Sequence, residues 1–247
     1  MFSHLRKLLG NITRFSGKAR KRSARRRLTF RSRRPQVEAL EDRWLLSTFT
    51  VVLPTDNGGP AGQMVTATTG DLRYCIEQAD AAHSATTDTI SFSPTVFATP
   101  QTITLKPVFG PLVLSDSHPL TINGPSPLTV TVSGGNQMEV FDVASGTVTM
   151  KNLAITNGNA ALGGGMFNHG NLTLTNCILE QNLASSSGAG GGLFNGGTAN
   201  LTNCTLELDS AGFGGAIANA IGRTVTLSNC NLSSDRAGTA RQMRSCQ

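Results

Sequence analysis

Four segments between residues 148 and 232 repeat one pattern of apolar and polar positions. In the first half of each segment two apolar residues stand two positions apart, as Leu172 and Leu174 do, with Thr or Asn between them. This alternation is typical of a short strand that buries one face. An asparagine follows each of these strands, and the four asparagines are separated by 24, 27 and 26 residues. A strand-based repeat of about 25 residues indicates a solenoid.

The buried phase shifts by one residue at each of these asparagines. Beyond Asn176 the apolar positions resume at Cys177 and Leu179, although an uninterrupted strand would bury Asn176 itself. A slip of one residue turns every side chain to the other face unless the chain bends there, so we predict a corner at each asparagine. Asn tolerates left-handed backbone, and stacked coils lie about 4.8 Å apart, so the amides are expected to form a hydrogen-bonded ladder. The ladder comprises Asn152, Asn176, Asn203 and Asn229.

The residue after each ladder asparagine is apolar, and these residues are expected to form an inward stack. The stack comprises Leu153, Cys177, Cys204 and Cys230. Free cysteine is among the most buried residue types, so we interpret the three thiols as part of the core. A disulfide between neighbours is the alternative, although it leaves one of the three cysteines unpaired. Glycine clusters precede three of the four segments and predict tight turns between coils.

The front of the repeat region contains one helical pattern, over residues 70–82. Its apolar residues are spaced at i, i+3, i+4 and i+7, and Asp71 is a candidate N-cap. These apolar residues are Leu72, Cys75, Ile76 and Ala79. A solenoid needs a terminal cap over its first coil, so this helix is expected to supply it. Strands are expected near residues 89–92, 101–105, 112–114, 120–122, 128–132 and 139–143.

These patterns predict an all-β fold, a right-handed parallel β-helix over residues 49–235 with regular coils from about residue 146. An α-solenoid is excluded because Gly, Asn, Thr and Ser interrupt the repeat every few residues. Residues 236–247 abandon the pattern and are expected to be an irregular tail at a truncated end.

The net charge of +6 conceals two regions of opposite sign. Residues 1–48 hold 14 Lys+Arg and 3 Asp+Glu, a net charge of +11, whereas residues 49–247 carry a net charge of −5. Such a density of like charge predicts a disordered basic N-terminal arm. A targeting or sorting segment is the favoured interpretation, with an inert tail as the alternative. Nucleic-acid binding is not expected, because the remainder of the chain is acidic and does not continue the positive surface.

Membrane insertion through a helix is not expected. No stretch approaches the roughly 18 uninterrupted apolar residues of a membrane-spanning helix. The basic arm also lacks the apolar region and small-residue cleavage site of a Sec-type signal. The export route and the oligomeric state are left open.

Short motifs resemble those of exported bacterial proteins. Leu40–Ser47 resembles the LEPR-XLL motif, with Asp42 in place of its proline, and stands after a basic arm as that motif does. Gly70–Glu77 resembles the CSLREAI-type segment at the start of many bacterial β-helix proteins, and Leu120–Pro125 resembles their first coils. Gly214–Ile217 is similar to the GGAI element of polymorphic outer-membrane-protein repeats. Together the resemblance implies a pectin-lyase-like fold and an exported location, and no particular reaction.

The candidate chemistry is sparse. Glu180 and Glu207 occupy equivalent positions of the repeat and are expected to stack on an outer face, with a weak calcium site as the alternative. The remaining acids and the four histidines are dispersed, so no catalytic or metal residue is assigned and no cofactor is expected. The acids considered are Asp116, Glu139, Asp142, Glu180, Glu207, Asp209 and Asp235, and the histidines are His4, His83, His118 and His169.

We therefore expect a non-enzymatic protein of the cell surface, outer membrane or extracellular space, either structural, adhesin-like or carbohydrate-binding. Its expected partners are a cell-envelope polysaccharide or another surface protein. The alternative is a polysaccharide lyase or hydrolase whose catalytic coils lie beyond this chain.

Overall fold

The computed structural model describes residues 48–58, 68–82, 87–115, 118–126 and 128–238. The chain divides into a unit of residues 1–42, which lies entirely outside this description, and a unit of residues 43–247. The predicted basic arm up to residue 47, the LEPR-XLL-like motif and the tail from residue 239 also lie outside the described residues.

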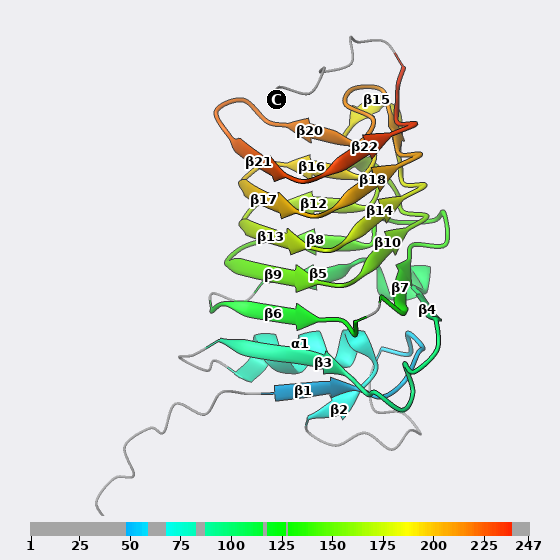
Figure 1. The fold of residues 1–247 in the computed structure, drawn as a ribbon, viewed down its shortest axis with the longest axis vertical. Helices are drawn as coiled ribbons and strands as arrows, with labels where there is room; N and C mark the ends of the chain where they lie inside the picture. The colour runs from blue at the N-terminus through cyan, green and yellow to red at the C-terminus, as the bar shows by residue number, and fades with distance from the viewer. Residues whose placement is uncertain (1–47, 59–67, 83–86, 116–117, 127, 239–247) are drawn as a thin grey trace, which may run out of the picture. The chain divides into compact units, whose positions relative to one another are not determined.

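The described residues form a parallel β-solenoid of about five turns, in which strands of successive coils pair in parallel (Figure 1). Each regular coil contributes one strand to each of four sheets. The first sheet contains β2 (Thr69–Gly70), β1 (Thr48–Val51), β3 (Asp88–Phe92), β6 (Leu120–Asn123), β9 (Thr147–Lys151), β13 (Asn171–Thr175), β17 (Thr198–Thr202) and β21 (Thr224–Ser228). The second sheet contains β4 (Gln101–Thr104), β7 (Val130–Ser133), β10 (Ala154–Thr156), β14 (Ile178–Glu180), β18 (Thr205–Glu207) and β22 (Asn231–Ser233).

The two remaining sheets complete each coil. The third sheet contains β11 (Asn159–Leu162), β15 (Leu183–Ala189), β19 (Ser210–Ala211) and β23 (Arg236–Ala237). The fourth sheet contains β5 (Leu112–Leu114), β8 (Phe141–Val143), β12 (Met166–Asn168), β16 (Leu193–Asn195) and β20 (Ile217–Asn219). A short 3₁₀ turn, η1, spans Pro107–Phe109.

Left-handed residues separate the first sheet from the second at each corner. The four ladder asparagines have φ between 52° and 55°, a region that Asn tolerates better than most residues. A second left-handed column follows five residues later in each coil, between the second and third sheets. It comprises Asn157, Gln181, Leu208 and Ser234, with φ between 52° and 60°.

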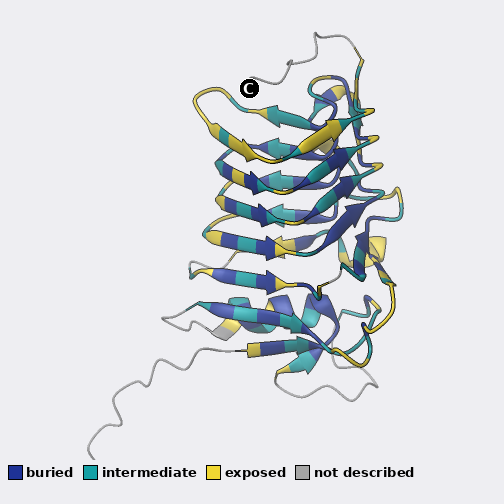
Figure 2. Cartoon of the chain, in the orientation of Figure 1, coloured by how far each residue is buried: buried dark blue, intermediate teal, exposed yellow. Residues whose placement is uncertain are grey.

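The core is a stack of buried apolar residues contributed by the sheets. Figure 2 shows buried residues recurring along the strands of successive coils. Leu172 of β13 pairs in register with Val148 of β9 and Ala199 of β17, and all three are buried. In the final described coil, Leu227 and Leu232 are 43% and 44% exposed, because β21 and β22 are the last strands of their sheets.

Helix α1 spans Leu72–Ala82 and packs against β1, β3 and β5. Its apolar positions at Leu72, Cys75, Ile76 and Ala79 are all buried. The backbone N–H of Tyr74 donates to Asp71 Oδ1 at 2.9 Å, so the Asp71 side chain satisfies an amide of the first turn.

Several expected boundaries differ from the structure. Arg236–Ala237 pairs with Ser210–Ala211, so the solenoid extends past the expected end at residue 235. The strands expected from residues 128 and 139 begin at Val130 and Phe141, and the strand expected to end at residue 105 ends at Thr104. The parallel register with the neighbouring strands begins or ends at these residues, although the Leu105 N–H still donates to the Ser133 carbonyl at 2.8 Å.

Candidate functional site

A groove with a cavity of about 520 Å³ lies where the chain passes from the fourth sheet into the first. Its floor is formed by Gly146, Gly170 and Gly197, which precede β9, β13 and β17 in successive coils. A Cβ on Gly170 would lie 2.6 Å from the Gly146 carbonyl oxygen, and one on Gly197 would be closer still to the Gly170 oxygen. The coils therefore stack this closely only with glycine at these positions.

Buried asparagines hold the glycine floor from beneath. The Asn168 Oδ1 accepts from the Gly170 N–H at 3.1 Å, and its Nδ2 donates to the Gly170 carbonyl at 3.3 Å. Asn195 makes the same two contacts with Gly197 in the next coil. Asn168 Nδ2 also donates to Asn195 Oδ1 at 2.6 Å, and Asn195 Nδ2 to Asn219 Oδ1 at 2.8 Å. We call Asn168, Asn195 and Asn219 the inner ladder; its hydrogen bonds fix the glycine turns that line the groove.

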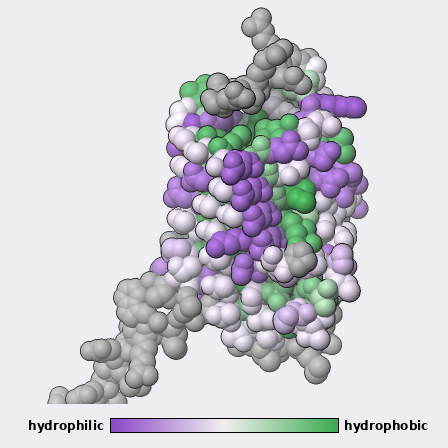
Figure 3. Space-filling view, in the orientation of Figure 1, coloured by the Kyte–Doolittle hydropathy of each residue, from purple (hydrophilic) through white to green (hydrophobic). Residues whose placement is uncertain are grey.

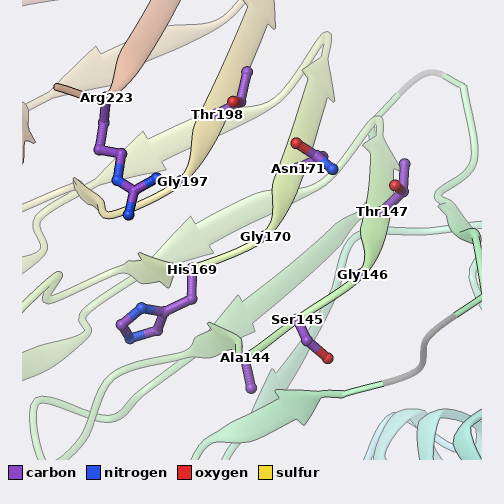
Figure 4. Close-up of a pocket in the computed structure, with 10 residues that line it drawn as sticks. All are labelled: Ala144, Ser145, Gly146, Thr147, His169, Gly170, Asn171, Gly197, Thr198 and Arg223. Carbon is purple, nitrogen blue, oxygen red and sulfur yellow. The ribbon is translucent and has the colours of Figure 1, made fainter.

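Polar side chains line both walls of the groove (Figure 4). One wall consists of Thr147, Asn171 and Thr198, which pair in register at the starts of their strands. Ser145, His169 and Arg223 lie on the other side of the glycine line. These side chains present hydroxyl, amide, imidazole and guanidinium groups, which suit a ligand with many hydrogen-bonding atoms.

An aromatic strip adjoins the groove on the outer face of the fourth sheet. Phe167 of β12 and Phe194 of β16 pair in register, with ring centroids 5.1 Å apart. His169 packs edge-on against Phe167 with centroids 4.1 Å apart. Both phenylalanines are half-buried. The strip offers apolar surface directly beside the polar wall.

Asp142 borders the aromatic strip, and Glu139 interacts with Asp142. Asp142 of β8 is the in-register neighbour of Phe167, and its Oδ1 is buried without a hydrogen-bond partner. Burial, with a contribution from Asp142, raises the pKa of Glu139 to about 7. Burial also raises the pKa of Asp142, and His169 opposes this shift. From their positions in the sequence, both residues are expected to be dispersed acids.

The predicted asparagine ladder lies at the opposite end of the first-sheet strands from the groove. Asn176 Nδ2 donates to Asn152 Oδ1 at 3.2 Å, and Asn203 Nδ2 donates to Asn176 Oδ1 at 3.3 Å. Asn229 continues the left-handed column in the last described coil. Figure 3 shows hydrophilic side chains gathered in a column across successive coils on this face. The ladder is thus a surface feature separate from the groove.

The predicted inward stack lies directly behind this ladder. Leu153, Cys177 and Cys204 are at most 1% exposed, whereas Cys230 in the last described coil is half-buried. The three cysteines are free thiols, and their Sγ atoms contact backbone carbonyls, as Cys204 does with Thr202 at 3.4 Å. The hydrogen bond with Cys177 and burial both raise the pKa of the Cys204 thiol.

The inner asparagines and the groove were not predicted as a site. A signal for them exists, because Phe-Asn follows two of the glycine clusters, at Phe167–Asn168 and Phe194–Asn195. Among the described residues no three His, Cys, Asp or Glu side chains are grouped as metal ligands. Within the same ranges, no helix is both long and apolar enough to cross a membrane.

The chain was compared with protein-family models, with curated proteins and with solved structures, and none of these comparisons gave a match.

Proposed function

We propose that this chain is an exported protein that binds a polysaccharide along the groove whose floor is formed by Gly146, Gly170 and Gly197. The single observation that carries this proposal is the in-register wall of Thr147, Asn171 and Thr198 above that floor. A solenoid repeats the same donors and acceptors at each coil, about 4.8 Å apart. A polymer of repeating polar units matches such an array better than a compact small molecule does.

The neighbouring side chains support a saccharide ligand. Sugar rings have one apolar face and a rim of hydroxyl groups, so they suit a site that joins apolar surface to hydrogen-bonding groups. Phe167 and Phe194 supply the apolar surface, and His169 and Arg223 supply donors beside it.

The proposed fold and location rest on the sequence resemblances. We place the solenoid among right-handed, pectin-lyase-like β-helices, with α1 capping the first coil. The basic arm and the LEPR-XLL-like segment support export to the cell surface, outer membrane or extracellular space, where a cell-envelope polysaccharide or another surface protein would be met. Fractionation of producing cells tests this: the full chain is expected outside the cytoplasm, and deletion of residues 1–47 is expected to retain it inside.

A second candidate function is polysaccharide cleavage, which the Glu139 and Asp142 pair favours. A carboxyl group with a pKa of about 7 is partly protonated at neutral pH and is suited to general acid catalysis. Glycoside hydrolysis also uses two carboxyl groups. Here Asp142 stands beside the aromatic strip, and neither acid lines the groove.

Binding of the full chain to a panel of neutral and acidic polysaccharides, followed by calorimetry, tests the proposal. At least one polysaccharide is expected to bind, and Asn171→Ala and Arg223→Ala are expected to weaken binding at least about tenfold, since each removes a hydrogen-bonding group. Arg236→Ala is the matched control, because Arg236 is an exposed arginine outside the groove. Equal binding by all three variants would place the ligand elsewhere.

Product analysis in the same panel separates the two functions. Intact polysaccharide after prolonged incubation is expected for a binding protein. Depolymerisation that Glu139→Gln and Asp142→Asn abolish would instead establish cleavage.

A further inference from the structure

One column of residues joins four successive coils near the start of the third sheet. It comprises Gly158, Asn182, Asp209 and Asp235, which follow the four ladder asparagines by six residues each. Within this column the backbone N–H of each coil donates to the side chain of the next. Gly158 N–H donates to Asn182 Oδ1 at 2.9 Å, Asn182 N–H to Asp209 Oδ1 at 2.8 Å, and Asp209 N–H to Asp235 Oδ1 at 2.9 Å.

Asn182 shows what this position requires. It is 1% exposed, and its Nδ2 donates to the Ile155 carbonyl and to Asp209 Oδ1, each at 3.0 Å. Its side chain therefore both accepts a hydrogen bond from the preceding coil and donates hydrogen bonds. An amide fulfils both roles without charge.

Asp209 places an oxygen where Asn182 has its donor. An ideal Cβ on Gly165 would lie 2.9 Å from Asn182 Nδ2, and the equivalent Cβ on Gly192 would meet Asp209 Oδ2. Ile155 and Leu179 are in-register partners, so Leu179 supplies the carbonyl equivalent to that of Ile155. Asp209 is fully buried, and its Oδ2 has no hydrogen-bond partner. An ionised Asp209 Oδ2 cannot donate a hydrogen bond to the Leu179 carbonyl, as Asn182 Nδ2 does to the Ile155 carbonyl.

The charged groups around Asp209 are also unfavourable to its ionised form. Asp235 in the next coil and Glu180 of β14 both disfavour a negative charge on Asp209. Asp235 has a buried Oδ2 without a partner, and Glu207 of β18 disfavours its charge in turn. The adjacent basic residue, Arg236, is exposed, and within residues 128–238 neither aspartate forms an ion pair.

We propose that this column is a proton-binding site: Asp209 carries a proton on Oδ2 at neutral pH and acts as the neutral, hydrogen-bond-donating counterpart of Asn182. Loss of the proton leaves a buried, unpaired charge between two coils, so the C-terminal coils are expected to loosen in alkali. Burial raises the pKa of Asp209 to about 8 and that of Asp235 to about 6, which agrees with this geometry.

The direction of the pH dependence follows from these raised values. The folded chain binds a proton at Asp209 that the unfolded chain has released above its ordinary pKa of about 3.9. The stability that this proton contributes is therefore fully present below about pH 3.9. It falls as the pH rises from there and is lost once the pH has risen through about 8. One extra bound proton changes the folding equilibrium constant about tenfold per pH unit within this window.

Urea unfolding of the full chain from pH 5 to 9 tests the proposal through Asp209→Asn. Because Glu139 also has a raised pKa, the informative quantity is the difference in free energy of unfolding between this variant and the wild-type chain at each pH. Between pH 6 and 8, the ratio of the folding equilibrium constant of Asp209→Asn to that of the wild-type chain is expected to rise about tenfold per pH unit. Glu139→Gln is the control, because it removes the other raised carboxyl group outside the column, and the effect of Asp209→Asn is expected to persist unchanged in this background.

A second measurement does not depend on the variants. The carboxyl carbon resonance of Asp209 in the wild-type chain is expected to titrate with a midpoint above pH 7. A midpoint below pH 5, or identical pH dependence in Asp209→Asn and wild type, would overturn the proposal. Stabilisation by millimolar CaCl₂ at pH 8 that Asp209→Asn abolishes would also overturn it, because a cation would then neutralise the column.

Discussion

Arg73 of helix α1 holds Asp56 in a two-point ion pair, with Nε 2.7 Å from Oδ1 and Nη2 3.1 Å from Oδ2. Both side chains are buried. The remaining guanidinium hydrogens are directed to the carbonyls of Phe109, Gly110 and Pro111. One arginine thus connects three separate segments at the front of the solenoid.

Replacing Arg73 with Met is expected to destabilise the chain by about 3–5 kcal/mol. The substitution leaves Asp56 as an uncompensated buried charge and leaves three carbonyls without their donor. Arg73→Lys is expected to rescue little, because an ammonium cannot form the two parallel contacts. Urea unfolding monitored by circular dichroism measures the loss. Lys106→Met, which removes an exposed contact with Asn57, is expected to cost less than about 1 kcal/mol.

Asn195→Ala is expected to cost about 3 kcal/mol or more, because it disrupts the inner ladder beneath the groove. The substitution leaves the buried Gly197 N–H without its acceptor and removes the Asn195 Nδ2 donor from the Gly197 and Thr224 carbonyls, and each lost partner costs about 1–3 kcal/mol. Calorimetric unfolding measures the loss. Since Asn195 also fixes the Gly197 turn, the variant is expected to weaken the proposed polysaccharide binding.

The outer ladder provides the control for that experiment. Asn176 is exposed and left-handed, so Asn176→Gly keeps its backbone conformation and leaves its neighbours' amides in water. We expect a loss below about 1 kcal/mol. Equal losses for the Asn176 and Asn195 variants would show that burial does not govern the strength of these ladders.

The regular coils could be predicted from the sequence because their rule is local. Alternation at Leu172 and Leu174 reports which face is buried, and the shift of phase at Asn176 reports a bend within a few residues. Left-handed backbone favours Asn, so the bend is also marked by residue type. The second corner could not be predicted from residue type, because Gln181 and Leu208 occupy it in successive coils and neither residue is typical of left-handed backbone.

The groove and the buried acids could not be predicted in this way because they depend on contacts between coils. Gly170 and Gly197 resemble ordinary turn glycines until the next coil stacks on them. Asp209 resembles an outer-face acid in the linear sequence, yet it is fully buried. Arg73 and Asp56 are 17 residues apart and follow no repeat.

The thiols are expected to differ sharply in reactivity. Cys75, Cys177 and Cys204 are buried, so iodoacetamide reaches their thiols poorly. Burial raises the pKa of Cys75 to about 12, so little Cys75 thiolate forms at pH 8, whereas the hydrogen bond with Cys204 lowers the pKa of Cys177. Cys230 is half-buried and is expected to react first with iodoacetamide among the four cysteines that the structure describes. Mass spectrometry of labelled peptides measures this order, and labelling in urea should remove it. Labelling of native Cys204 as fast as Cys230 would contradict the inward stack.

Leu208→Asn is expected to stabilise the chain by about 1 kcal/mol. Leu208 has a φ of 58°, a conformation that costs a residue with a Cβ roughly 1–2 kcal/mol, and its side chain is 44% exposed. Asn157 occupies the equivalent corner two coils earlier, where its Nδ2 donates to Thr156 Oγ1 at 3.2 Å. The substitution therefore relieves backbone strain and removes little buried apolar surface.

Thermal unfolding of Leu208→Asn against Leu208→Gly and Leu206→Asn separates these two contributions. Leu208→Gly tests the backbone alone and is expected to be neutral or slightly stabilising, because glycine adopts positive φ freely but adds unfolded-state entropy. Leu206 is fully buried, so Leu206→Asn is expected to cost about 3 kcal/mol or more. If Leu208→Asn instead lowers the unfolding temperature, contacts of the Leu208 side chain outweigh the strain at its backbone, and the corner tolerates leucine because it packs there.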